Sequence, residues 1–400
     1  MKILIITNLA PMIDNLISGI FITNRLKEYE KFKVSYIAVS LGFDDTTIVK
    51  LIKKALKKPS SKAACCYQGV FFEPINIRRG LIGVVKSRSN YHILVDEFVK
   101  SIENEFDISS FDIIHAHGMF NVPAGEVAKE LANRYHKPYI VTLHGDDVNT
   151  LMSVPKRKEK YLRVLNQADK VIFVSQALLK KASALGFNPK NAVVIPNGYN
   201  PQIFKPMDKN TIRRDLRIYQ PNTRYVGFVG ALAHVKRADK LVEIFSSIKK
   251  ELPDVKFIVV GDGEYRAMME KQAQKLDLDL MITGFVQQEL VAKYMNAMDV
   301  MILPSRNEGF GAVCIEAQAC GTCVIGSNNG GIPEAIGFEE YIVEEGQDFE
   351  KRFAQRVVDI LKNGYDSQKL IERVKNYMWI EIVRKEIQVY EEVLLGRSKQ

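Results

Sequence analysis

The sequence of 400 residues is poor in tryptophan and cysteine and contains no long apolar run. Its five cysteines are Cys65, Cys66, Cys314, Cys320 and Cys323. They form neither a disulfide ladder nor paired CxxC motifs, so we expect reduced thiols in an intracellular chain. No stretch reaches the roughly 18 apolar residues of a membrane span, and the run after Met1 is too short for a signal peptide. These absences exclude a disulfide scaffold and a membrane-spanning protein.

The sequence has fewer acidic than basic residues. It contains 47 Asp and Glu and 56 Lys and Arg, which gives a net charge of +9. The excess lies in residues 1–200, where 28 basic residues face 18 acidic ones; residues 201–400 hold 28 and 29. The first half therefore meets an acidic partner or is well solvated. A chain of this length with 46% hydrophobic and 26% charged residues predicts a globular protein of two or three domains.

Short β-branched runs alternate with longer segments of helical period, which is typical of a parallel sheet wrapped by helices. The first series of expected strands is Lys2–Thr7, Val34–Val39, Ile113–His115, Tyr139–Leu143, Lys170–Val174 and Val193–Ile195. The second series is Arg224–Val229, Lys256–Val260, Met281–Thr283, Val300–Leu303 and Thr322–Gly326. We predict an α/β protein of two Rossmann-like, doubly wound domains, 1–200 with a crossover helix at about 377–400, and 201–376. Such folds bind ligands at the carboxyl ends of their strands, so the cleft between the domains is the expected site.

A lysine-rich segment, Lys50–Lys62, carries six lysines around four apolar residues that cluster on one helical face. This pattern is typical of a helix lying on an anionic membrane surface. A solvated surface helix explains the same charges equally well. A nucleic-acid patch is disfavoured, because no stacking aromatic residue is interleaved before Tyr67.

In the first half, Gly19 precedes a helical stretch, where backbone N–H groups can approach a phosphate, although a turn glycine is the simpler interpretation. Three of the six histidines, His115, His117 and His144, stand at strand ends next to glycines. We expect a packing role for His115 and His117, and a polar pocket for His144, which can donate to a sugar hydroxyl. The neighbouring pair Asp146-Asp147 lacks a third ligand at a readable spacing, so we expect no metal.

In the second half, Lys236 and Arg237 follow the strand that ends near Gly230, and a cation delivered there suits an anionic leaving group such as a diphosphate. An exposed basic loop is the alternative. The segment 304–317 reads PSRNEGFGAVCIEA and predicts a strand, a glycine loop and a helix beginning near Gly311. Glu308 falls in the loop and Glu316 on the helix. Between them, glycine backbone N–H groups can approach a ligand, and the two carboxylates can accept hydrogen bonds from sugar hydroxyls.

The order of these segments resembles glycosyltransferase family 4, retaining enzymes of the GT-B fold. The resemblance spans nearly the whole chain, from the loop at Gly19 to the helix that carries Trp379. It includes the motifs HAHG, LHGDD, FVS, PNG, GDG, E-x7-E and GGIPE. Ser18–Phe21 and His144–Asn149 are also similar to enzymes that build teichuronic acid or capsule.

The resemblance implies a role for each candidate residue. Glu308 binds hydroxyls of the donor sugar, and Glu316 binds the ribose of the nucleotide. Backbone at Gly19, Phe310, Gly311 and Ala312 contacts sugar and phosphates, Lys236 neutralises the diphosphate, and His144 lies near the reacting face of the sugar. Many relatives carry an arginine where this chain has Ala231, so either Lys236 acts alone, Arg237 substitutes, or phosphate binding is weaker.

We therefore expect a retaining glycosyltransferase that moves a sugar from a nucleotide-diphosphate donor to the hydroxyl of a lipid-linked or glycan acceptor. The expected setting is bacterial surface polysaccharide or glycolipid synthesis at the inner membrane face, in a cytoplasmic, peripheral protein without metal or other cofactor. The alternatives are a GT-B sugar-nucleotide epimerase or hydrolase and an inactive glycosyltransferase-like partner subunit. Nucleic acid is not an expected partner.

Overall fold

The computed structural model describes residues 1–13, 19–55, 65–79, 91–120 and 122–397. The chain divides into unit 1, Met1–Pro196 with Trp379–Gln400, and unit 2, Asn197–Met378. The sequence placed these boundaries at 200 and 376. The described helices fall short of the length and apolar character that crossing a membrane requires.

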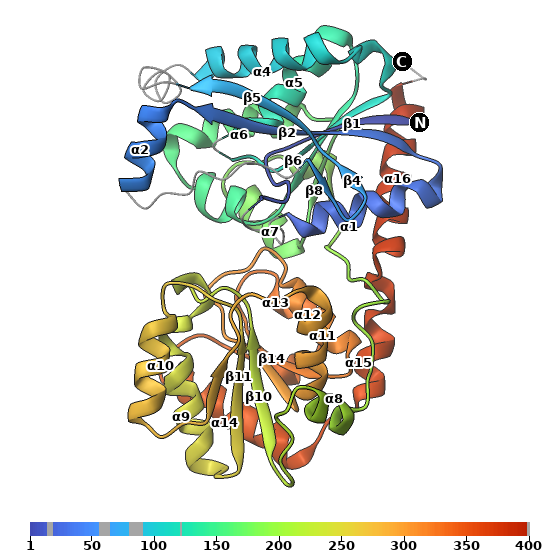
Figure 1. Ribbon diagram of the computed structural model, residues 1–400. Coiled ribbons are helices and arrows are strands. Elements are labelled where there is room, and N and C mark those ends of the chain that lie inside the picture. Colours follow the sequence, from blue (N-terminus) through green and yellow to red (C-terminus); the bar gives the residue numbers. More distant parts are fainter. Residues whose placement is uncertain (14–18, 56–64, 80–90, 121, 398–400) are drawn as a thin grey trace. The chain divides into compact units, whose positions relative to one another are not determined.

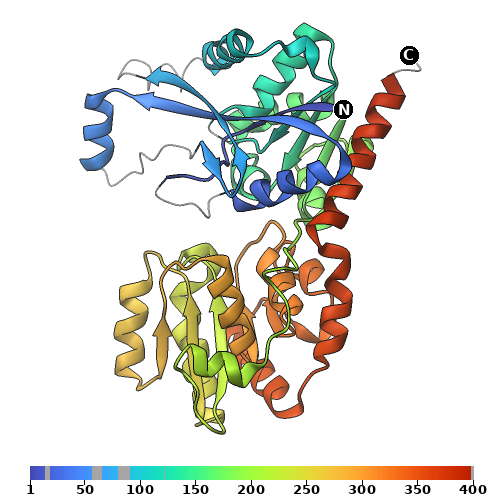
Figure 2. The ribbon, with the colours of Figure 1, turned by 45° about the vertical axis from the view of Figure 1, so that its right-hand side comes forward.

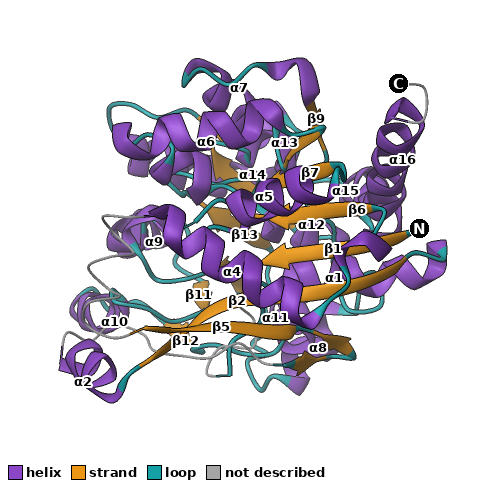
Figure 3. Ribbon diagram, turned by 90° about the horizontal axis from the view of Figure 1, so that it is seen from above, coloured by secondary structure: helices purple, strands orange, loops and turns teal. Residues whose placement is uncertain are grey.

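Unit 1 is built on a parallel sheet whose described strands run in the order β5-β2-β1-β6-β7-β8-β9. Its strands are β1 Lys2–Thr7, β2 Ser35–Asp45, β5 Glu73–Arg79, β6 Ile113–His117, β7 Tyr139–Leu143, β8 Lys170–Phe173 and β9 Ala192–Val194, with a small hairpin of β3 Cys66–Tyr67 and β4 Val70–Phe71. Its helices are α1 Ile20–Tyr29, α2 Thr47–Ala55, α4 Tyr91–Glu105, α5 Ala124–Tyr135, α6 Pro155–Gln167, α7 Gln176–Ala184 and α16 Trp379–Arg397. Figure 3 shows β5, β2 and β1 running side by side.

Unit 2 repeats this plan with a second parallel sheet in the order β12-β11-β10-β13-β14-β15. Its strands are β10 Arg224–Val229, β11 Val255–Val260, β12 Leu280–Ile282, β13 Val300–Leu303, β14 Cys323–Ser327 and β15 Ile342–Val343. Its helices are α8 Lys209–Asp215, α9 Leu241–Glu251, α10 Arg266–Lys275, α11 Gln288–Ala297, α12 Ala312–Ala319, α13 Ile332–Ile336, α14 Phe349–Asn363 and α15 Ser367–Val374. Both units are thus Rossmann-like and doubly wound, as the sequence predicts (Figure 1).

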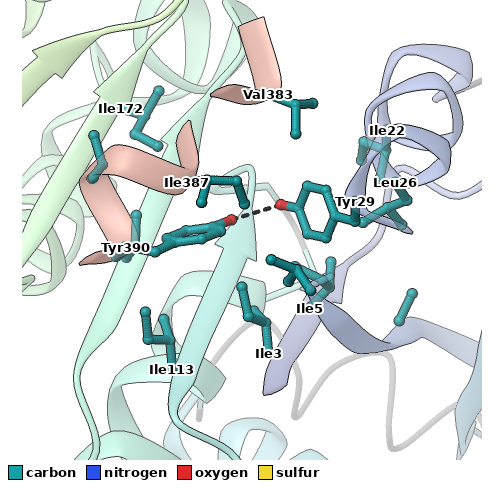
Figure 4. Packing of buried hydrophobic residues seen from close by; sticks show 14 of the residues in the cluster. Ile3, Ile5, Ile22, Leu26, Tyr29, Ile113, Ile172, Val383, Ile387 and Tyr390 are labelled. Carbon is teal, nitrogen blue, oxygen red and sulfur yellow. Dashed lines mark hydrogen bonds between the residues drawn. The ribbon is translucent and has the colours of Figure 1, made fainter. Parts of the chain in front are cut away.

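The C-terminal helix α16 belongs to unit 1, although more than 180 residues of unit 2 separate it from the rest of that unit. Figures 1 and 2 show it lying alongside α1. Trp379, Ile382 and Tyr390 of α16 are buried in one cluster with Ile3 of β1 and Ile22 of α1. The cluster also holds a hydrogen bond of 2.7 Å between the hydroxyls of Tyr29 and Tyr390 (Figure 4). The last helix therefore completes the core of the first unit.

Candidate functional site

The strand order of unit 2 reverses at its centre, where β10 pairs with β13 and the chain continues outward on both sides. Open α/β sheets bind ligands at such a point, beyond the carboxyl ends of the strands. Lys236 ends the short 3₁₀ turn His234–Lys236 that follows β10, and Glu308 lies in the loop between β13 and α12. The two residues that the sequence singled out therefore occupy the two central loops of this sheet edge.

Lys236 and Glu308 form an ion pair, with 2.5 Å between Lys236 Nζ and Glu308 Oε1. The Ser305 hydroxyl donates to the same carboxylate oxygen at 2.9 Å. The Glu308 side chain is 10% exposed and the Lys236 side chain 26% exposed, so the pair is partly shielded from water. Partial burial strengthens the interaction of both groups with a polar ligand at this edge.

Contacts with the next loop fix the backbone around Glu308. The carbonyl of Ser305 accepts from Ser327 Oγ at 2.6 Å and from Asn329 Nδ2 at 3.1 Å. Gly330 has φ +56°, and a Cβ atom there would lie 2.2 Å from the carbonyl oxygen of Glu308. A larger residue at position 330 would displace the backbone that presents the Glu308 carboxylate.

The helix α12 begins directly after this loop, with Gly311 at its N-cap. The Cys314 N–H donates to the Gly311 carbonyl at 2.9 Å, at the start of the helix. The N–H groups of the helical residues before Cys314 have no acceptor within the helix. Ala312 is the first of these. The Phe310 side chain is buried and stacks on Tyr377, with ring centroids 5.8 Å apart. The positive end of a helix thus follows Glu308 closely in the sequence and suits a phosphate.

Glu316 lies in the second turn of α12 and is partly exposed. Burial of its carboxyl group raises the pKa to about 7. Near neutral pH this group is therefore divided between a carboxylate, which accepts hydrogen bonds, and a carboxylic acid, which also donates one.

Arg237 differs from its neighbour Lys236 in its surroundings. Its guanidinium is buried, forms ion pairs with Glu345 and, at 3.1 Å, with Glu350, and lies 4.0 Å from the centre of the Phe349 ring. The sequence offered Arg237 as a substitute for the arginine missing at Ala231. The described partners of Arg237 lie on α14 and in the loop before α14. The guanidinium therefore stabilises the packing of this turn against α14.

The strand order of unit 1 also reverses at its centre, between β1 and β6. Gly19 follows the loop after β1 and is the N-cap of α1, with φ +64°. A Cβ atom there would lie 1.4 Å from the Leu9 carbonyl oxygen, so glycine is required by this close approach. Ser18, which the sequence grouped with Gly19, lies outside the described residues.

His144 follows β7 and is held between two rings. Its Nε2 lies 3.3 Å from His117 Nδ1, and its ring centroid lies 4.6 Å from that of Phe21. Burial, with smaller contributions from Arg25 and His115, holds the pKa of His144 well below its usual range, so the imidazole is neutral. Its Nδ1 has no hydrogen-bond partner among the described residues. The neutral ring therefore has one buried nitrogen whose hydrogen-bonding capacity is unused.

His115 and His117 are fully buried in the core, as the sequence interpretation preferred. His115 bonds to the Tyr390 hydroxyl at 2.5 Å through Nδ1 and to the Thr142 hydroxyl at 2.8 Å through Nε2, and burial lowers its pKa to about 4. His115, His117 and Glu386 offer ligand atoms within 4.8 Å of one another. Glu386, however, already faces the Arg25 guanidinium at 2.7 Å, so this cluster holds its own cation and does not fit a metal ion.

The pair Asp146-Asp147 is also unsuited to a metal ion, because the Asp147 carboxylate is buried and used by the backbone. It accepts from the N–H groups of His144 and Gly145 at 2.9 Å and of Val148 at 3.0 Å. Burial raises the pKa of Asp147 to about 6, although the three backbone hydrogen bonds act in the opposite direction and lower it. Asp147 therefore fixes the turn that carries His144.

Sequence reasoning missed the buried polar partners in unit 1. Arg25 and Tyr29 of α1 meet Glu386 and Tyr390 of α16, and both tyrosine hydroxyls lie against the Glu386 carboxylate. Burial alone would raise the pKa of Glu386, but Arg25 and His115 keep it below its usual value. The sequence signal that could have revealed them is the spacing of four residues between Arg25 and Tyr29 and between Glu386 and Tyr390. This spacing puts two polar side chains on one otherwise apolar face of each helix.

Comparisons with known proteins match both halves of the chain to glycosyltransferase families. Residues 64–203 match the family described as Glycosyltransferase Family 4, and residues 208–377 match the family described as Glycosyl transferases group 1. The putative teichuronic acid biosynthesis glycosyltransferase TuaC of Bacillus subtilis is 27% identical over 349 residues, which cover 86% of this chain and 85% of that protein. N-acetyl-alpha-D-glucosaminyl L-malate synthase of Bacillus anthracis is 27% identical over 275 residues, covering 68% and 70%.

Two solved structures share the fold. Sucrose-phosphate synthase of Thermosynechococcus elongatus superposes with a TM-score of 0.75 at 19% identity and covers 99% of both chains. HepE of Anabaena, solved in complex with UDP and glucose, has a TM-score of 0.71 at 18% identity, covering 98% of this chain and 100% of its own. From the two family matches and this fold, the chain belongs to the glycosyltransferases of the GT-B fold, with a family 4 domain in its first half and a group 1 domain in its second.

Proposed function

We propose that the protein transfers a sugar from a nucleotide-diphosphate donor to an acceptor hydroxyl with retention of configuration at the anomeric carbon. The observation that carries this proposal is the Lys236–Glu308 pair at the carboxyl edge of the unit 2 sheet, beside the N-terminus of α12. A sugar nucleotide needs a cation for its diphosphate and a carboxylate for its sugar hydroxyls, and this edge offers both.

In the proposed reaction the anomeric C–O bond to the diphosphate breaks, and charge collects on the departing phosphate. Lys236 and the amides at Gly311 and Ala312 are fixed positive groups that stabilise this charge without reorganising. Glu308 accepts hydrogen bonds from the sugar. Glu316 accepts hydrogen bonds from the ribose.

The acceptor oxygen bonds to the anomeric carbon on the face that the diphosphate leaves, and a leaving phosphate oxygen takes the acceptor proton. This route needs neither a protein base nor a metal ion. We assign Gly19 to phosphate contact and His144 to a sugar hydroxyl. Since the guanidinium of Arg237 already has partners, the diphosphate falls to Lys236, with Arg237 holding the turn on which that lysine lies.

The comparisons support a sugar-nucleotide donor, because HepE was solved with UDP and glucose and the relatives include a putative teichuronic acid glycosyltransferase. On this basis we propose bacterial surface polysaccharide or glycolipid synthesis, in the cytoplasm, with a lipid-linked or glycan acceptor. The test is a panel of radiolabelled UDP-, GDP- and dTDP-sugars with purified protein and lipid or glycan acceptors. Transfer of label supports the proposal. Epimerised donor or free sugar, formed equally without acceptor, would identify an epimerase or hydrolase, and no turnover or binding of any donor would identify an inactive subunit.

We expect nucleotide binding to depend on the ionisation of Glu316. With a pKa of about 7 in the free protein, the carboxylate fraction falls about tenfold between pH 8 and pH 6. If the ribose binds the carboxylate, the Kd of the nucleotide rises by about that factor over this range. Calorimetry at both pH values measures it, and Glu316→Gln should remove the dependence. An unchanged pH dependence in this variant would contradict the ribose assignment.

The helix α2 supports a membrane-facing surface on unit 1. Ile48, Leu51 and Ile52 are 57%, 62% and 44% exposed, an unusual display of apolar side chains. Lys50 and Lys53 flank them, although these lysines also pair with Asp44 at 3.2 Å and Asp45 at 2.6 Å. Lys54 is also exposed, and the lysines from Lys57 onward lie outside the described residues. We assign this surface to the anionic lipid where the acceptor lies.

Leu51→Glu is expected to weaken binding to vesicles with anionic lipid by at least tenfold. Burying a leucine contributes about 1.5–3 kcal/mol, and the new carboxylate is repelled by the same surface. Co-sedimentation measures the binding. Leu276→Glu, at a leucine that is 48% exposed on unit 2, is the matched control and should bind as the wild type does. Equal vesicle binding by Leu51→Glu and wild-type protein would contradict the membrane-facing role of α2. The positive charge of the first half would then serve only the solubility of the protein.

A further inference from the structure

Arg306 connects the two loops that carry Lys236 and Glu308. It lies two residues before Glu308, in the loop after β13. Its backbone N–H donates to the Val235 carbonyl at 2.8 Å, and its Nη1 donates to the His234 carbonyl at 2.7 Å. One residue of the Glu308 loop therefore binds two consecutive carbonyls of the turn that ends at Lys236.

Asp239 completes this connection from the far side of Lys236. It lies in the 3₁₀ turn Ala238–Lys240 and receives both terminal nitrogens of Arg306, Nη1 on Oδ1 at 2.6 Å and Nη2 on Oδ2 at 2.9 Å. A paired fork of this kind fixes direction as well as distance. The hydrogen bonds from Arg306 also hold the pKa of Asp239 below its usual range, so the carboxylate stays charged.

The Lys236 turn needs an external anchor on this side. Val235 is 41% exposed and His234 is also exposed, so side-chain burial contributes little to holding these residues. Lysine has a long, flexible stem, and its charge is useful to a departing phosphate only if the backbone beneath it is fixed. Arg237 anchors the other side of the turn through Glu345 and Glu350.

We propose that Arg306 and Asp239 form a positioning pair that holds the Lys236 ammonium in register with the Glu308 carboxylate, and so sets the rate of sugar transfer without either residue touching the donor. This inference rests on the proposed function and deepens it. The pair acts through Lys236, so its effect should disappear when Lys236 is absent. A pair that stabilises the fold generally would act with or without Lys236.

The experiment is a double-mutant cycle that measures kcat and donor KM for Arg306→Lys in the wild-type protein and in Lys236→Ala. Arg306→Lys keeps the positive charge but loses the fork. We expect kcat to fall at least tenfold in the wild-type background and less than twofold in Lys236→Ala, with thermal unfolding confirming that each variant is folded. Asp239→Asn should repeat this pattern. Arg266→Lys is the matched control, because Arg266 is likewise a guanidinium in ion pairs, with Asp262 and Glu270, but lies outside the two loops that carry Lys236 and Glu308, and the substitution should leave kcat unchanged.

The outcomes separate this inference from the proposed function. A wild-type kcat in folded Arg306→Lys protein, or equal losses in both backgrounds, would overturn the positioning pair. If Lys236→Ala itself retains the wild-type rate, the role of Lys236 in the proposed function fails instead.

Discussion

Replacing Lys236 by alanine is expected to lower kcat for sugar transfer by about 10²–10³, the loss typical when one fixed positive group is removed from a developing anion. The ammonium lies 2.5 Å from Glu308, and the Lys236 side chain is 26% exposed. Water that enters the space left by the lysine can therefore stabilise the departing phosphate only in part. Because the charge on the diphosphate grows as the anomeric bond breaks, the loss should appear in kcat more than in donor KM. Initial rates with a labelled donor over a range of concentrations measure both constants.

Lys240→Ala provides the matched control for this variant. Lys240 lies four residues later, has a side chain that is 42% exposed and pairs with Glu243 at 2.8 Å. Its removal takes away the same charge from the same stretch of chain, and the rate should stay within twofold of the wild type. If Lys236→Ala and Lys240→Ala lower kcat equally, the effect comes from net charge and Lys236 has no special role.

Glu308→Gln is expected to lower kcat/KM at least tenfold and up to about 10², because a neutral amide replaces a charged acceptor of the sugar hydroxyls. Glutamine has nearly the same shape, so the packing of the loop is kept. The substitution also removes the ionic partner of Lys236 and weakens the acceptor of the Ser305 hydroxyl. Steady-state kinetics should show a raised donor KM, which distinguishes this variant from Lys236→Ala.

The control here is Glu339→Gln, at an exposed glutamate of the same unit. It makes the same chemical change away from the switch point of the sheet and should leave kcat/KM within twofold. Binding of free nucleotide, measured by calorimetry, adds a second readout. Glu308→Gln should bind the nucleotide nearly as well as wild-type protein does, since the sugar is absent. A large loss of nucleotide affinity would place Glu308 at the nucleotide and contradict its assignment to the sugar.

The central strands could be predicted from the sequence because buried parallel strands read as continuous β-branched runs. The predicted and observed bounds agree for β1 Lys2–Thr7 and β10 Arg224–Val229. The edge strand β5 was missed, since Glu73–Arg79 contains Pro74 and charged residues. Proline is tolerated there because an edge strand leaves one row of backbone groups unpaired, so the pattern of β5 resembles a loop.

The candidate site was predictable where one chain segment carries its own signal. Glu308 and Gly311 stand within four residues of each other, and the spacing alone indicates a loop before a helix. Pairings across the fold leave no such trace. Nothing in the sequence around Asp239 points to Arg306, 67 residues later. Such partners depend on which loops the strand order brings together, which single-sequence patterns do not encode.

The return of α16 to unit 1 has a consequence for the order in which the protein is made. Unit 2 is one continuous segment, Asn197–Met378, and its sheet is complete in the nascent chain before Trp379 is synthesised. Unit 1 must wait with Ile3 and Ile22 uncovered until Tyr390 emerges from the ribosome. Domains generally fold as units during synthesis. The second unit along the chain is therefore the first able to reach its native state, and the first unit depends longest on protection from aggregation.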